Sequence, residues 1–117
     1  MAYYLVKAKV HGDLQELAER LRSGEVRSFV PFGRALEYSL KNARREEEGT
    51  VVWEELDYCS PPLAQERSEV LDDYFDLLEV ARVEEGEGWD AIADLPKVFD
   101  FPATGADRVK RRADSDD

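Results

Sequence analysis

The chain has 117 residues, of which 43% are hydrophobic, so we expect one compact domain with a core of its own. Its 27 acidic residues against 16 basic ones give a formal net charge of −11, which argues against nucleic acid as a partner. No apolar run approaches the ~20 residues of a membrane-spanning helix, the N-terminal segment lacks the pattern of a signal peptide, and a single cysteine excludes an internal disulfide, so we expect a cytoplasmic protein without a membrane partner.

The first two elements have clear patterns. Residues 3–10 alternate as a strand does and place Tyr4, Val6, Ala8 and Val10 on one face. Residues 13–24 predict a helix, because Asp13 can cap it, Glu16 completes a pattern like a capping box, and Gly24 supplies a stop. The helix then carries its leucines on one side.

The segment 34–44 has two interpretations. Leu36, Leu40 and Ala43 have helical spacing, but Leu36, Tyr38 and Leu40 also alternate with polar residues as in a strand. Residues 51–58 are a more definite strand. We favour a strand at 34–44, because it would form a hairpin with 51–58 across the turn at 46–49.

The second half of the chain predicts a helix and a strand. Ser60 and Pro61 have the residue types of an N-cap and a first helical position, so we expect a helix from there to about Phe75. Residues 76–85 predict the last strand. One helical turn follows near Trp89, and 103–117 have almost no apolar content, so we expect a disordered charged tail.

The resulting order, β-α-β-β-α-β, predicts an α+β domain over residues 1–102. It is that of a ferredoxin-like fold, with a four-stranded antiparallel sheet, two helices on one face and a short C-terminal extension. If 34–46 were helical, the fold would instead be an irregular α+β sandwich. A shared topology by itself predicts no function.

Cys59 is the only cysteine and lies between a strand and the expected helix. A nucleophilic cysteine needs a base such as His11. In the predicted sheet the two residues end neighbouring antiparallel strands, roughly 20 Å apart. We therefore predict a structural role for Cys59.

No catalytic or metal-ligating set is evident elsewhere. One histidine and one cysteine are too few for a classical zinc site. The carboxylate runs at 46–48, 72–76 and 84–87 lack the spacing of a calcium loop. The chain also lacks a P-loop and a dinucleotide-binding glycine motif. We expect no metal, no cofactor and no catalytic residue.

Aromatic residues on the predicted strands are the most informative candidates for a site. A ferredoxin-like sheet leaves one face without helices, and an aromatic face of that kind needs a cover. We expect Arg34, Tyr38, Asn42 and Trp53 to line a pocket over this face. The favoured function is a non-enzymatic interaction or ligand-binding domain that forms a homodimer. The alternative is a small cofactor-independent enzyme of the dimeric α+β barrel type.

The balance of charged residues also bears on the environment of the protein. Eleven arginines accompany only five lysines, and acidic residues dominate. This composition is similar to that of proteins from salt-accumulating organisms, in which salt screens the repulsion between carboxylates. An arginine-favouring genome is the alternative explanation.

Overall fold

The computed structural model describes residues 1–47, 49–58 and 60–101. Their strands form one antiparallel four-stranded sheet in the order β2-β3-β1-β4. The strands are β1 (Ala2–Val10), β2 (Arg44–Glu47), β3 (Thr50–Asp57) and β4 (Phe75–Val83). The predicted α+β class with an antiparallel sheet is therefore confirmed.

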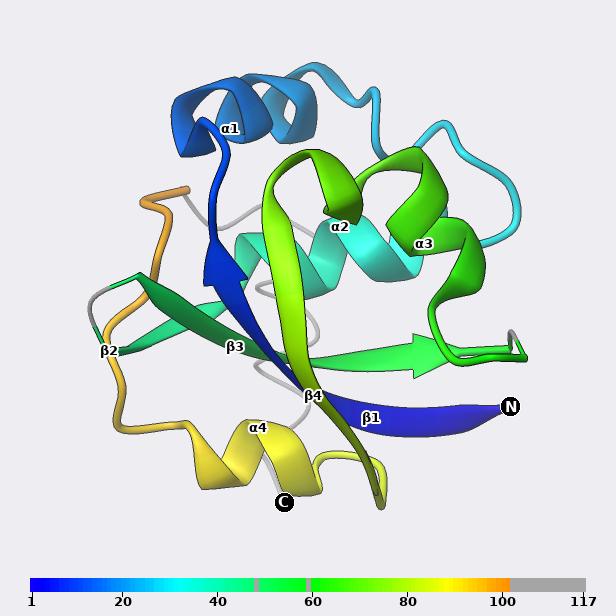
Figure 1. Ribbon diagram of the computed structural model, residues 1–117, viewed down its shortest axis with the longest axis vertical. Coiled ribbons are helices and arrows are strands. Elements are labelled where there is room, and N and C mark those ends of the chain that lie inside the picture. Colours follow the sequence, from blue (N-terminus) through cyan, green and yellow to red (C-terminus); the bar gives the residue numbers. More distant parts are fainter. Residues whose placement is uncertain (48, 59, 102–117) are drawn as a thin grey trace, which may run out of the picture.

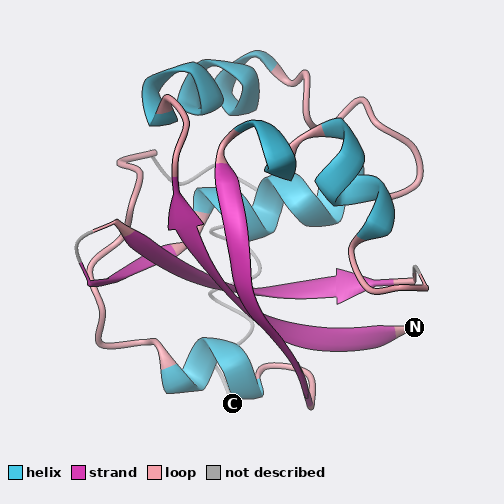
Figure 2. Cartoon of the chain, in the orientation of Figure 1, coloured by secondary structure: helices cyan, strands magenta, loops and turns pink. Residues whose placement is uncertain are grey.

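The helices lie on both sides of the sheet. They are α1 (Leu14–Ser23), α2 (Gly33–Lys41), α3 (Ala64–Glu69), the 3₁₀ turn η1 (Leu71–Asp73) and α4 (Glu87–Ala91). Figure 1 shows α1, α2 and α3 on one side and α4 on the other. Figure 2 shows one long loop between α1 and α2 and another that follows α4. Because α2 lies along the β3 edge of the sheet, its Tyr38 also reaches the side of α4. We call the side of α1 to α3 the core face and the side of α4 the second face.

The alternation of β1 decides which residues enter the core. Val6 and Ala8 are fully buried on the core face, as the sequence predicts, while Leu5 and Lys7 point to the second face. On the neighbouring strand Val51 and Trp53 share the core face. The helices close this layer with buried leucines: Leu17, Leu21, Leu36, Leu40, Leu63 and Leu71.

The predicted strand at 34–44 is wrong. Gly33–Lys41 is the helix α2, and only Arg44–Glu47 forms a strand, which pairs with residues 50–52 of β3. Helical spacing prevails because it buries Leu36 and Leu40 completely, whereas the alternating pattern would also have buried Tyr38. The helix lies beside β3 beyond the end of β2, where Ser39 Oγ donates to the Glu54 carbonyl at 2.7 Å.

The start of the predicted helix at Ser60 is also wrong. The helix α3 begins at Ala64, after Leu63 in a left-handed conformation with φ 63°. The carboxylate of Asp57 accepts the Leu63 backbone N–H at 2.6 Å and fixes the chain there. Leu63, Val70 and Leu71 are nevertheless buried, because the short helix and η1 still turn them toward the sheet.

The first helix follows its sequence signals more closely. Asp13 Oδ1 accepts the backbone N–H of Gln15 at 2.9 Å and that of Glu16 at 3.3 Å, and Gly24 ends the helix with φ 86°. The side chain of Glu16 accepts instead from the Tyr74 hydroxyl at 2.8 Å. The cap is thus confirmed, while the reciprocal half of the capping box is replaced by a tertiary contact.

Two of the predictions concern residues outside the described part of the chain. These are the disordered tail at 103–117 and the role of Cys59. Among the described helices, none is both long and apolar enough to cross a membrane.

Candidate ligand-binding cleft

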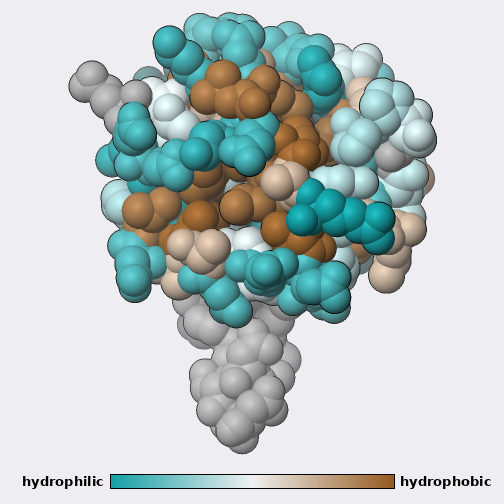
Figure 3. Space-filling view, turned by 60° about the horizontal axis from the view of Figure 1, so that its bottom comes forward, coloured by the Kyte–Doolittle hydropathy of each residue, from teal (hydrophilic) through white to brown (hydrophobic). Residues whose placement is uncertain are grey.

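A cleft of about 650 Å³ opens on the second face of the sheet. Its floor is the sheet, one wall is α2, and the other wall is the loop after β4 together with α4. Figure 3 turns this side of the molecule forward and shows apolar residues near the middle of the face, bordered by hydrophilic ones. The lining residues are Tyr3, Arg34, Ala35, Tyr38, Ser39, Glu54, Leu56, Glu85, Gly86, Trp89 and Asp90.

Glu54 holds the second wall in place. Its side chain leaves β3 on the second face and is 3% exposed. Oε1 accepts the backbone N–H of Gly88 at 2.7 Å and of Trp89 at 3.3 Å, and Oε2 accepts that of Gly86 at 2.9 Å. These N–H groups begin α4 and have no partner within the helix. The carboxylate therefore joins the short helix to the sheet.

Gly88 lets the helix approach this carboxylate. A Cβ atom at this position would lie 2.9 Å from Glu54 Oε1, 3.2 Å from Glu54 Cβ and 3.3 Å from Leu5 Cδ1. Distances of this size are too short for a side chain without displacement of a neighbour. The close packing of α4 on the sheet thus favours glycine at position 88.

Aromatic rings line the two walls and the floor. The rings of Tyr38 on α2 and Trp89 on α4 meet edge to face, with centroids 6.1 Å apart at 88°. Tyr3 contributes a third ring from β1. Partial burial raises the pKa of the Tyr3 hydroxyl, as do the nearby charge of Glu85 and a hydrogen bond to it. The rings give the cleft an amphipathic lining of the kind that small organic molecules occupy.

The charged residues stand around the rings. Arg34 is exposed on α2 and, within the described part of the chain, makes no ion pair. Glu85 and Asp90 are exposed on the opposite wall. A ligand in the cleft would therefore meet a guanidinium from one side and carboxylates from the other.

The structure brings together two of the four predicted ligand-binding residues. Arg34 and Tyr38 both line the cleft. Asn42 follows the end of α2, where its amide donates to the Tyr38 carbonyl at 2.8 Å and accepts from Lys97 at 3.2 Å. Trp53 is fully buried on the core face against Phe75. Asn42 and Trp53 thus do not line this cleft.

Sequence reasoning missed Glu54 and Trp89 as parts of a site. A signal for Glu54 existed, because a carboxylate in the middle of an apolar strand needs a partner when buried. Its partners, however, are backbone amides of a short helix more than thirty residues later in the chain. No local pattern could have identified them.

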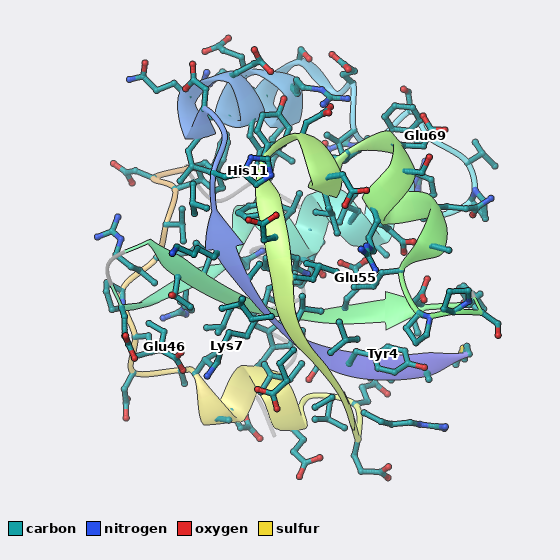
Figure 4. The ribbon with its side chains drawn as sticks, in the orientation of Figure 1. Tyr4, Lys7, His11, Glu46, Glu55 and Glu69 are labelled. Carbon is teal, nitrogen blue, oxygen red and sulfur yellow. The ribbon has the colours of Figure 1, made fainter. Side chains whose placement is uncertain are left out.

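The core face holds a second group of buried carboxyls. Glu55, Asp57 and Glu66 are 0%, 3% and 0% exposed, and Figure 4 shows Glu55 between β3 and α3. Trp53 Nε1 donates to Glu55 Oε1 at 3.1 Å, while Oε2 has no hydrogen-bond partner among the described residues. Burial, followed by the charge of Glu66, raises the pKa of Glu55 well above its usual value.

No group of histidine, cysteine, aspartate and glutamate within the described residues is arranged to hold a metal ion. The single histidine, His11, lies after β1 with Nε2 at 3.1 Å from the Asp72 carbonyl. On the second face, Lys7 and Glu46 form an ion pair at 3.0 Å (Figure 4). These polar contacts join neighbouring parts of the fold and lie outside the cleft.

Comparison with known protein families, with curated proteins and with solved structures finds no match to this chain.

Proposed function

We propose that the protein is a small non-enzymatic domain that binds a small organic molecule in the cleft between α2, the sheet and α4. The observation that carries this proposal is an open cleft of about 650 Å³ lined by three aromatic rings and by charged groups on both walls. A volume of this size is typical of small-molecule sites.

The chemistry of Glu54 favours binding over catalysis. It is the only buried carboxylate in the lining, and its two oxygens already accept three backbone N–H groups. A carboxylate held by three bonds lacks the mobility expected of a general base. We therefore assign Glu54 to the architecture of the cleft.

The experiment is a thermal-shift screen of flat fragments against a variant with a filled cleft. Ala35 lines the cleft from α2, so Ala35→Trp should occupy part of its volume. Gln15→Trp is the matched control, because Gln15 is exposed on α1. Fragments that raise the melting temperature of the wild type and of Gln15→Trp should fail to do so for Ala35→Trp.

The same screen can also contradict the proposal. If the effective fragments act equally on Ala35→Trp, they bind elsewhere and the cleft is not the site. Tyr38→Ala provides a second test, since it widens the cleft instead of filling it and should weaken the same fragments. A screen in which no fragment stabilises the wild type would likewise contradict the proposal.

Four finer points belong to the same proposal. We propose that the sheet is a variant of the ferredoxin-like arrangement in which α2 replaces part of the second strand. We also propose that the protein is a homodimer and that it is located in the cytoplasm. We also propose salt adaptation as the origin of the net charge of −11. Light scattering at low and high salt tests the oligomeric state and its salt dependence together.

A further inference from the structure

The charges that line the cleft are unequal in number and in position. Three carboxylates, of Glu54, Glu85 and Asp90, oppose the single guanidinium of Arg34. Glu54 is occupied by the backbone of α4. The carboxylates of Glu85 and Asp90 are exposed on the wall opposite Arg34, and each has more lone pairs than a single neighbour can use. Acceptors for a cationic ligand are thus in excess.

The rings add to the same preference. The face of an aromatic ring is electronegative and attracts a cation within about 6 Å. Tyr3, Tyr38 and Trp89 belong to three different elements and line one cleft. Rings of this kind also stack on flat molecules. A ligand that is both flat and positively charged would satisfy the rings and the carboxylates at once.

The charge of the whole chain acts in the same direction. A net charge of −11 creates a negative potential that attracts cations and repels anions. Exposed acidic residues also occupy the edge strand β4, at Asp76 and Glu79. The long-range field and the local lining therefore both favour positively charged ligands.

We infer that the cleft takes a flat organic cation, of the amidinium, guanidinium or protonated arylamine class. The apolar body of the cation lies against Tyr38 and Trp89, and its positive group faces the wall that carries Glu85 and Asp90. This inference rests on the proposed function, because it names the class of ligand for the same cleft.

Three probes of nearly equal size and shape separate charge from fit: benzamidine, benzamide and benzoate. Their affinities can be measured by the fluorescence of Trp89 in a Trp53→Phe background, since these are the two tryptophans of the chain. At low salt we expect benzamidine to bind about tenfold more tightly than benzamide. Benzoate should bind most weakly, and molar NaCl should reduce the advantage of benzamidine.

Variants that remove charges from the cleft show which side chains cause the preference for benzamidine. The double variant Glu85→Gln/Asp90→Asn should reduce the preference for benzamidine over benzamide to about twofold. The matched control is Asp76→Asn/Glu79→Gln, which removes two exposed charges that do not line the cleft. Arg34→Gln should strengthen the binding of benzamidine by about twofold.

The outcomes distinguish the inference from the proposed function. If benzoate binds most tightly, or if the three probes bind equally, and Ala35→Trp abolishes that binding, the cleft is a ligand site but not one for cations. If the double variant changes no more than its control, the inference also fails. If no probe binds, the inference fails and the fragment screen decides the proposed function. If a probe binds and Ala35→Trp has no effect on it, both the inference and the proposed function are contradicted.

Discussion

Glu54 and Glu55 are neighbours on β3, yet their surroundings differ completely. Both are buried, at 3% and 0% exposure. Glu54 points to the second face and accepts three backbone N–H groups from the start of α4. Glu55 points to the core face and accepts one bond, from the indole of Trp53, while one of its oxygens has no partner among the described residues.

Adjacent residues of a strand point to opposite faces of the sheet. The same residue type therefore has two different roles at positions 54 and 55. On the second face, a charged carboxylate is compensated by backbone dipoles and supports the wall of a cleft. On the core face, an uncompensated carboxylate is costly when charged, and burial raises its pKa. We therefore expect the two positions to respond in opposite ways to loss of their charge.

The largest change in the free energy of unfolding is expected from substitution of Glu54. Replacing Glu54 by Gln removes a charged acceptor and places an amide donor against backbone donors, so the folded state should lose about 2–3 kcal/mol. Urea denaturation measures this loss. An unchanged free energy of unfolding would show that the bonds to Gly86 and Gly88 contribute little.

The next effect concerns the approach of α4 to Glu54. Gly88→Ala introduces a Cβ atom at 2.9 Å from Glu54 Oε1, so the helix must move and stability should fall by about 1–2 kcal/mol. The control is Ala91→Ser at an exposed position of the same helix. Equal stability of the two variants would contradict the close packing described here.

Substitution of Glu55 is expected to change the free energy of unfolding less and in the opposite direction, toward greater stability. Because its pKa is raised in the folded state, the folded protein holds the proton more strongly than the unfolded chain. Its stabilising contribution is complete below the unfolded pKa of about 4.3 and is lost as the pH rises through the folded pKa. Glu55→Gln removes this loss and should stabilise the protein by about 1 kcal/mol at neutral pH.

Denaturation across the pH range tests this expectation. The difference between Glu55→Gln and the wild type should be small in acid and grow with pH. A difference that stays constant from acid to neutral pH would mean that Glu55 is not the titrating group. Glu54→Gln provides the comparison, since its loss of stability should persist at neutral pH.

Part of this contrast could be predicted from the sequence, and part could not. The sequence predicted strands at 3–10 and 51–58, and the structure has β1 and β3 there, with Glu54 and Glu55 on opposite faces. The strand expected at 34–44 was wrong, because Leu36 and Leu40 fit both the helical and the strand period, and only burial decides between the two. The cleft depends on that decision, since α2 forms one of its walls.

The predicted site was also only partly recoverable from the sequence. Arg34 and Tyr38 were expected in one pocket, and both line the cleft; that they bind a ligand stays a prediction. Trp53 was expected with them, but the alternation of β3 that buries Val51 also turns Trp53 into the core. Glu54 and Trp89 could not be paired from the sequence, because their contact joins a strand to a helix formed much later in the chain.

The smallest expected effect concerns salt. Screening acts on exposed charges and much less on buried ones. Raising KCl from low to molar concentration should therefore increase the melting temperature of the wild type and of Glu55→Gln by about the same few degrees. A clearly smaller increase for Glu55→Gln would show that Glu55 is accessible to ions and that the contrast with exposed carboxylates does not hold.

The two tryptophans report directly on whether a ligand binds at the second face and not at the core face. Trp89 lines the cleft, and the Trp53 indole donates to Glu55 in the core. Each indole N–H gives its own signal in a ¹H–¹⁵N correlation spectrum, so one titration with benzamidine reports on both faces. We expect the Trp89 signal and the backbone amides of Gly86 and Gly88 to shift while the Trp53 signal stays in place. An unmoved Trp89 signal, or equal shifts at both indoles, would contradict this expectation.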